Sequence, residues 1–594
     1  MTPQDYYNQQ ITCYSQQLKQ IKKQRNLITL AKLLTFAALI FQIYWLITTY
    51  TFPVVWAIVC VVLFILLTQL DQRIVKQQKL LEELISINQQ ETDYLSGVLS
   101  SFASGQVYSD PTHPYAGDLD LFGEDSLFQH LNRTATSAGT HKLANWLLTL
   151  SKEPETIRQR QEAVAELSEL PEWCHYFRAL GKLHPTQEID SSILHQWQEQ
   201  PAFFKNVRRT RTILYLANSI TLMSWVLVAI GLFPYGLALI FSLLQLLILT
   251  LFLKKINLYH NQLNRFIRTI SNYLPLIRQL EQQSFHSAYL QNIKNILLKS
   301  SCNALKALSA LNKIQERLDQ RGNVLTAFVL NGLYLKDMHI ILSMDKWKKT
   351  YSSDVDMWTT ATSETDALVS MANYRYNHPD YTFPILNDSI LLDAREAGHP
   401  LLKGKNKVTN DFRVDHLHQL YIVTGANMAG KSTFLRTIGV NLVLAQSGNV
   451  VYSSQFTFQP MALFTSMRTT DNLAKDTSYF HAELLRLKQL IVTAEQEERL
   501  FIILDEMLKG TNSVDKLNGS LAFLRKLLSY PVSGLVATHD LALGDLATSY
   551  PSNFLNTCFE ITHTGKDISY DYKLHPGVSS TMNASILLKQ MGLI

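Results

Sequence analysis

The segment GANMAGKS at residues 425–432 constrains the fold of this chain more than any other feature. It has the pattern GxxxxGK[ST], and it comes directly after the apolar run LYIVTG at residues 420–425. Glycines at these positions let the backbone wrap around a phosphate, while successive amides and the N-terminus of a following helix point at the negative charge. The sequence therefore predicts a strand, a phosphate-binding loop and a helix that begins near Thr433.

The loop also carries the side chains that ATP chemistry requires. Lys431 is expected to reach the β- and γ-phosphates, and Ser432 is expected to ligate Mg²⁺. A glycine-rich turn with a surface lysine is the competing interpretation, and the motifs further along the chain weigh against it. The expected nucleotide-binding residues of the loop are Gly425, Ala426, Asn427, Met428, Ala429, Gly430, Lys431, Ser432 and Thr433.

Two later apolar runs end in catalytic residue types. LFIILDE at residues 500–506 predicts a buried strand whose Asp505 holds Mg²⁺, through water or Ser432, and whose Glu506 is the general base. GLVATHD at residues 534–540 predicts another strand, ending in His539, which is expected to contact the γ-phosphate. An acidic pair alone could instead cap a helix, and a lone histidine could lie in a solvated loop. Their positions after the loop favour catalysis.

Two pairs of apolar runs lie at residues 27–70 and 212–253, split by the turns TTYTFP and GLFPYG. Each run has about 20 residues, enough to cross about 30 Å of hydrocarbon as a helix. Lys and Arg flank both pairs and are absent from both turns, so the positive-inside rule puts both ends of each hairpin in the cytoplasm. We expect four transmembrane helices in the cell (inner) membrane, contacting lipid, with buried core helices as the competing interpretation.

The composition agrees with this organisation. Hydrophobic residues make up 47% of the chain and charged residues only 17%, below the roughly 25% typical of soluble domains. The formal net charge of +5 is mild for 594 residues, so it does not predict nucleic-acid binding. The 5 cysteines have no CxxC or paired spacing, which disfavours a disulfide framework or zinc site and indicates a reducing compartment.

Together the motifs resemble those of the MutS family of DNA mismatch repair ATPases, relatives of the ABC-type ATPases. The family's loop reads TGPNMGGKST, and TGANMAGKST at residues 424–433 differs from it only at Ala426 and Ala429. DEMLKGTNSVD at residues 505–515 is similar to the family's DEIGRGTSTYD, and ATHD matches its ATH switch. DTSYFHAEL at residues 476–484 is similar to STFxxEM, whose serine, here Ser478, reaches the partner's nucleotide across a dimer.

The resemblance extends to residues 126–148 and 157–167, which are similar to the start of the family's helical core, and to residues 573–593, which resemble its closing segment. It implies a homodimer with composite ATP sites, ATP and Mg²⁺ as cofactors, and binding of mismatched or branched DNA. Two departures stand out. The first apolar hairpin stands where the family has its mismatch-recognition domain, and Lys407 stands where the family usually has an aromatic that stacks on adenine.

The expected fold is an α/β P-loop ATPase domain with a mostly parallel sheet, joined to all-α core and lever helices and four transmembrane helices. The expected parts are an N-terminal cytoplasmic helix, a first transmembrane hairpin, a helical linker, the first core part, a second hairpin, returning lever helices and the ATPase domain. Their ranges are 1–26, 27–70, 71–110, 111–205, 206–255, 256–375 and 376–594.

Two functions fit these expectations. The resemblance implies an ATPase of DNA mismatch repair type. The alternative is a membrane-anchored, ATP-driven conformational switch that acts on a protein partner without mismatch recognition. A scaffold that only binds nucleotide is disfavoured, because Lys431, Asp505, Glu506 and His539 are all present.

Overall fold

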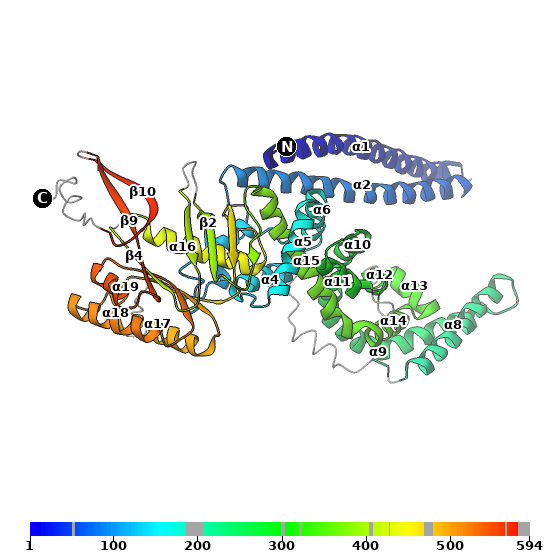
Figure 1. Cartoon of the computed structure of the whole chain (residues 1–594). Helices are drawn as coiled ribbons and strands as arrows, with labels where there is room; N and C mark the ends of the chain where they lie inside the picture. Colours follow the sequence, from blue (N-terminus) through cyan, green and yellow to red (C-terminus); the bar gives the residue numbers. More distant parts are fainter. Residues whose placement is uncertain are drawn as a thin grey trace. The chain divides into compact units, whose positions relative to one another are not determined.

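A computed structural model describes residues 1–49, 54–185, 203–204, 206–298, 303–319, 324–402, 408–426, 428–468, 479–564 and 567–579 (Figure 1). The chain folds as two compact units, each built from separate stretches of sequence. The helical unit comprises Met1–Thr92, Thr134–His141 and Glu172–Asp366. The α/β unit comprises Asp93–Arg133, Lys142–Pro171 and Ala367–Ile594.

The helical unit begins with two long helices, α1 (Pro3–Thr49) and α2 (Val54–Leu95). They lie side by side, joined by ion pairs such as Lys32 Nζ to Asp71 Oδ2 at 2.5 Å. One helix runs through residue 26 and the other through residue 70, so these expected boundaries between parts are not helix ends. No glycine or proline interrupts either stretch, so nothing in the sequence ends the helix there.

A second antiparallel pair consists of α8 (Val207–Ala229) and α9 (Tyr235–Ser271). Gly231, with φ 75°, and Pro234 make the turn between them. Four helices of the described chain are long and apolar enough to cross a membrane: α1, α2, α8 and the first part of α9. Between 0% and 22% of each apolar stretch is buried within the chain, which argues against the interpretation as buried core helices.

The remaining helices of this unit are shorter than expected. The sequence predicts long amphipathic helices over residues 255–345, whereas the structure has helices of 9 to 16 residues after α9. Pro275 starts a new helix just after α9, and Leu335, with φ 46°, separates α13 from α14. The helices after α9 are α10 (Leu274–Gln282), α11 (Ala288–Leu298), α12 (Ala304–Asp319), α13 (Val324–Tyr334) and α14 (Lys336–Tyr351). The unit also contains α6 (Pro171–Leu183) and the first part of the 23-residue α15 (Val355–Asn377).

The α/β unit contains a six-stranded sheet in the order β10-β9-β4-β8-β7-β6. All neighbouring pairs are parallel except β9 and β10, which confirms the expected mostly parallel α/β fold. The strands are β4 (Leu420–Gly425), β6 (Ala462–Ser466), β7 (Leu500–Asp505), β8 (Val532–Ala537), β9 (Phe554–Thr564) and β10 (Asp567–Pro576).

A smaller sheet, which the sequence did not predict, has the order β1-β5-β2-β3. Its strands are β1 (Ile385–Leu386), β5 (Gln455–Phe458), β2 (Leu392–Ala397) and β3 (Asn410–Val414). β2 pairs antiparallel with both β3 and β5, so this sheet is built from segments on either side of the loop at residues 425–432.

Helices cover both faces of the larger sheet. Alternate residues of β7, such as Leu500 and Ile502, pack in one core with α17 (Tyr479–Gln496) and α18 (Ser513–Leu527). Ile503 faces the other way and lies against Gly439 of α16 (Lys431–Ser447). Because β4, β7 and β8 run parallel, their carboxyl ends meet at one edge, the usual ligand-binding edge of such sheets.

The remaining helices of this unit are α3 (Leu127–Leu131), α5 (Pro154–Ser168) and α19 (Leu546–Ser549), while α4 (Ser137–Leu148) crosses the boundary between the units.

Candidate nucleotide site

The loop between β4 and α16 has the tight backbone that its glycines predict. Gly425, with φ 144°, leaves no room for a side chain, because an added Cβ would lie 2.8 Å from the carbonyl oxygen of Phe559. Gly430, with φ 107°, caps the N-terminus of α16, and Met428 also has a left-handed φ of 67°. Asn427, another predicted loop residue, lies outside the described residues.

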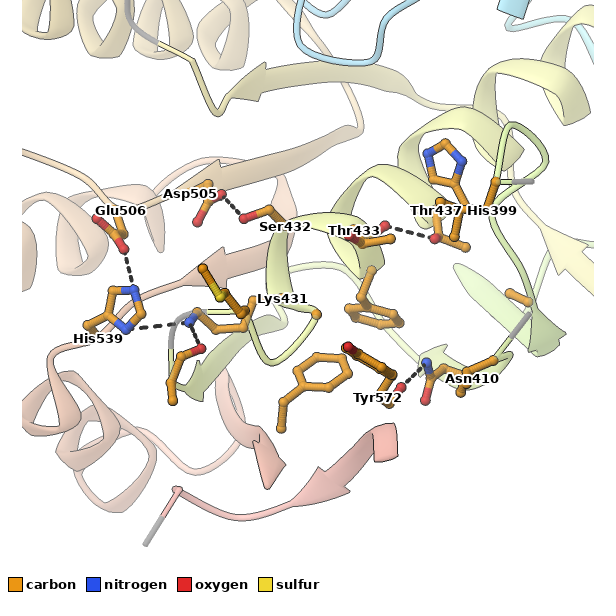
Figure 2. A pocket seen from close by; sticks show the side chains of 18 of the residues that line it. His399, Asn410, Lys431, Ser432, Thr433, Thr437, Asp505, Glu506, His539 and Tyr572 are labelled. Atoms are coloured by element: carbon orange, nitrogen blue, oxygen red, sulfur yellow. Dashed lines mark hydrogen bonds and ion pairs between the residues drawn. The ribbon is translucent and has the colours of Figure 1, made fainter. Parts of the chain in front are cut away.

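A cavity of about 590 Å³ opens at the carboxyl ends of the strands (Figure 2). It brings together most of the predicted site residues, from three separate motifs. Two predicted residues, Gly425 and Ala429, do not line the cavity. Ala429 is buried within the loop. The lining residues are Ala397, His399, Leu402, Val408, Asn410, Ala426, Met428, Gly430, Lys431, Ser432, Thr433, Phe434, Thr437, Asp505, Glu506, Lys509, His539, Phe559 and Tyr572.

Lys431 lies at the start of α16, with its ammonium folded back onto the loop. Its Nζ donates to the carbonyl oxygens of Gly425 and Ala426 at 2.7 and 2.9 Å, and lies 3.4 Å from His539 Nδ1. Burial lowers the pKa of Lys431 to about 8, even though the nearby Asp505 and Glu506 raise it. The loop carbonyls therefore hold this cation in place of a phosphate group.

Ser432 and Asp505 bring two oxygen ligands together at the next position of the cavity. The Ser432 hydroxyl donates to Asp505 Oδ2 at 2.6 Å. Hydroxyl and carboxylate oxygens suit Mg²⁺, which keeps several waters and shares substrate phosphates rather than needing a full protein cage. The described part of the chain has no group of three or more His, Cys, Asp or Glu that could hold a metal.

Glu506 follows β7 in a left-handed conformation, with φ 52°, and its backbone N–H donates to the Ala537 carbonyl on β8 at 3.0 Å. Its Oε1 lies 2.5 Å from His539 Nε2, and its Oε2 lies 3.7 Å from Lys509 Nζ. The hydrogen bond from His539 is the main reason that the pKa of Glu506 falls to about 2. Glu506 is thus ionised at neutral pH, as a general base must be.

Glu483, on α17, is a residue that the sequence reasoning missed. Its side chain is buried, and its two carboxylate oxygens accept the backbone N–H groups of Leu508 and Lys509 at 2.5 and 3.0 Å. One turn earlier, Phe480 touches Gly510 so closely that an added Cβ there would lie 2.8 Å from Phe480 Cβ. The first turn of α17 therefore fixes the loop that follows Glu506.

The other end of the cavity is lined by residues of the two sheets, which sequence reasoning also missed (Figure 2). Tyr572 of β10 has φ 55° and lies in a bulge between Tyr570 and Leu574. Asn410 of β3 holds this bulge by donating to the Tyr572 carbonyl at 3.0 Å and accepting from the Leu574 N–H at 2.8 Å. The run of aromatic residues in SYDYKL was the available signal. Lys407 and Ser478 lie outside the described residues.

The strand order defines an α/β domain with a mostly parallel sheet, and the loop before α16 has the sequence pattern of a phosphate-binding loop. Residues 421–589 match the family model of MutS domain V. This region of the chain is therefore similar to domain V of the MutS family.

Three curated relatives show the extent of the similarity. The DNA mismatch repair protein MutS of Persephonella marina is 30% identical over 232 residues, covering 38% of this chain and 26% of the relative. MutS protein homolog 4 of Mus musculus is 31% identical over 228 residues, covering 37% and 23%. The MutS of Myxococcus xanthus is 31% identical over 237 residues, covering 38% and 26%. The chain thus spans about a quarter of the length of these relatives.

Proposed function

We propose that the α/β unit binds and hydrolyses ATP with Mg²⁺ in the cavity described above. The observation that carries this proposal is the meeting, in one cavity, of Lys431, the Ser432–Asp505 pair and the Glu506–His539 pair. Loss of water from such a site strengthens each of these electrostatic contacts. The MutS relatives support the same reading.

Each residue has a role that follows from its position. Lys431 exchanges the carbonyls of Gly425 and Ala426 for phosphate oxygens, and the amides at the start of α16 bind the same group. Ser432 and Asp505 hold Mg²⁺, which neutralises charge on the phosphates. Glu506 accepts a proton from the attacking water, while His539 orients Glu506. Adenine stacks on the ring of Tyr572. Tyr572 thus takes the role of the family's usual aromatic, whose place in this sequence is occupied by Lys407.

Nucleotide binding by paired variants tests this proposal. Lys431→Ala should abolish binding of a fluorescent ATP analogue, because it removes the cation that faces the phosphates. Lys526→Ala, an exposed lysine at the end of α18, is the matched control and should bind normally. Equal binding by both variants would assign the cavity to another ligand.

We propose further that the ATP cycle is coupled to mismatched DNA, as the name of the DNA mismatch repair relative suggests, or to branched DNA, as the family resemblance implies. Detergent-solubilised protein should bind such duplexes with an affinity that depends on ATP and falls steeply with salt, because phosphate contacts release counterions. A perfectly paired duplex of the same length is the control. No binding at low salt would rule out the DNA proposal.

The second candidate is a membrane-anchored switch that acts on a protein partner, with the α/β unit in the cytoplasm. Four long apolar helices with exposed apolar surfaces favour it. The chain should stay in the membrane pellet after alkaline carbonate extraction, and protease added from the cytoplasmic side should digest the α/β unit. Release by carbonate would contradict membrane insertion.

A homodimer with composite ATP sites is the proposed assembly, and it rests on the family resemblance of Ser478. Ser478→Ala should lower turnover while nucleotide binding by each chain persists. If turnover stays normal in Ser478→Ala but is lost in Lys431→Ala, Ser478 does not reach across to a partner's nucleotide.

A further inference from the structure

Helices α13 and α14 both pack against the α8–α9 hairpin. Gly332, near the end of α13, faces Leu246, where an added Cβ would lie 3.7 Å from Leu246 Cγ. Leu246 is at the midpoint of the apolar stretch Tyr235–Leu258. Gly332 therefore reaches the middle of this candidate membrane span.

The start of α14 meets α8 at the same depth. His339 Nε2 and Asn218 Nδ2 are 2.7 Å apart, and Asn218 is at the midpoint of Val207–Ala229. Beyond this level, α14 shares a buried cluster with the part of the hairpin that leads to Lys254 and Lys255. The shared buried cluster is Phe203, Leu214, Leu249, Ile256, Leu335, Met338, Ile341 and Leu342.

Leu335, which lies between α13 and α14, is enclosed by protein, whereas the side chain of Tyr334 beside it is exposed. Leu335 is 1% exposed, and its N–H donates to the Asn331 carbonyl at 3.1 Å. The Asn331 side chain accepts the N–H of Asp337 at 2.9 Å. Asp337 is buried and Lys336 is half-buried, so neither charged side chain is fully presented to the surroundings of the hairpin.

Polar and apolar residues are arranged inside out in this part of the helical unit. The polar side chains face inward, as when Gln245 Nε2 donates to the Thr221 hydroxyl at 2.8 Å with both residues buried. On the outer side, Phe328 and Val329 of α13 are 60% and 54% exposed. No charged residue occurs from Val324 to Leu335. This is the arrangement that lipid, rather than water, selects.

We propose that α13 and the start of α14 form a re-entrant hairpin, which enters the bilayer from the side of the basic flanks and ends at its midplane. Phe328 and Val329 contact acyl chains, continuing the exposed apolar surface of α8 and α9. The inference rests on the proposed membrane insertion of α8 and α9.

Two physical constraints agree with this geometry. The 11 residues of α13 span about 16 Å, about half of the roughly 30 Å of a hydrocarbon core. Non-helical backbone is tolerated at membrane depth only where protein encloses it, and the buried Leu335 meets this condition.

Photo-crosslinking of the full chain in phosphatidylcholine–phosphatidylglycerol vesicles tests the proposal. Phe328 is replaced by p-benzoylphenylalanine, a close mimic that captures whatever lies against the ring. Ile240, exposed on α9, reports on the hairpin itself, and Met357, an exposed apolar residue of α15, controls for general apolar exposure. Lipid adducts, counted by mass spectrometry, should form at positions 328 and 240 in similar yield and far less at position 357.

The outcomes separate the two proposals. Adducts at position 240 but not at 328 would overturn the re-entrant hairpin and leave the membrane span intact. Adducts at neither position would overturn both. A chain-to-chain adduct at position 328 in place of a lipid adduct would also overturn the re-entrant hairpin. It would show instead that this face is an interface between copies of the chain.

Discussion

At the scale of single residues, the hydrogen bond between His539 and Glu506 keeps the proposed base ionised even at acidic pH. Because His539 lowers the pKa of Glu506 to about 2, the carboxylate is ionised throughout the working range of pH. Glu506→Gln should therefore bind ATP normally yet lose roughly 10²-fold or more in turnover, the scale of a lost general base. Single-turnover assays with radiolabelled ATP measure this, and near-normal turnover would refute the assignment.

The pKa of Lys431 makes a separate prediction about pH. Burial lowers it to about 8, so above that pH the side chain becomes neutral and no longer attracts phosphate. The affinity for ATP should fall as pH rises through about 8, whereas Lys431→Arg should remain insensitive, since arginine stays protonated. Fluorescence titrations between pH 7 and 9.5 compare the two proteins. A flat profile for the native chain would mean that phosphate binding keeps the lysine charged.

Which site residues could be predicted depends on what holds them. Lys431, Ser432, Asp505, Glu506 and His539 are fixed by local strand–loop patterns, so the sequence alone identifies them. Tyr572 enters the cavity only because Asn410, from a distant strand, holds the bulge around it. Glu483 acts through a contact with a loop 25 residues further on. Neither contact leaves a periodic signal in the sequence.

At the scale of elements, the side chain of Glu483 joins α17 to the loop after β7 through two hydrogen bonds. Glu483→Ala removes both acceptors of the loop N–H groups, at a cost of about 1–3 kcal/mol per unsatisfied group. Turnover should drop because Glu506 loses its position, while ATP affinity changes little, since Lys431 and Ser432 are untouched. Lys488→Ala, exposed on the same helix, is the control. Equal losses of binding and turnover would point to general unfolding of the unit instead.

Among the strands and helices, those formed by local sequence patterns could be predicted, and those that depend on single residues or on pairing with distant strands could not. β4, β7 and β8 could be predicted, because they are buried on both faces and appear as short apolar runs. The smaller sheet could not, since β1 has only two residues and β2 and β3 mix charged with apolar side chains. The helical breaks after α9 depend on single residues such as Leu335, which no turn pattern marks.

At the scale of the whole molecule, ligand binding should stabilise only the unit that holds the cavity. A nucleotide at 100 times its Kd adds about 2.7 kcal/mol to the stability of the folded state. Differential scanning calorimetry of the full chain should show one transition that rises with ATP and Mg²⁺ and another that does not move. Removing Mg²⁺ with EDTA should cancel most of the rise. A rise of both transitions together would mean that the two units unfold as one.

The unbroken helix α1 has a mechanical consequence. Its 47 residues make a rod of about 70 Å, of which a bilayer core of about 30 Å takes less than half. With the apolar part inserted as proposed, about 40 Å projects beyond the core. Ion pairs such as Lys22–Glu82 and Arg25–Asp71 brace that part against α2. A tilt of about 0.1 radian at the bilayer would move the N-terminal end of α1, where Tyr7 packs against His175 of α6, by about 4 Å. The braced rod thus passes a small rotation on to α6 as a displacement as large as a side chain.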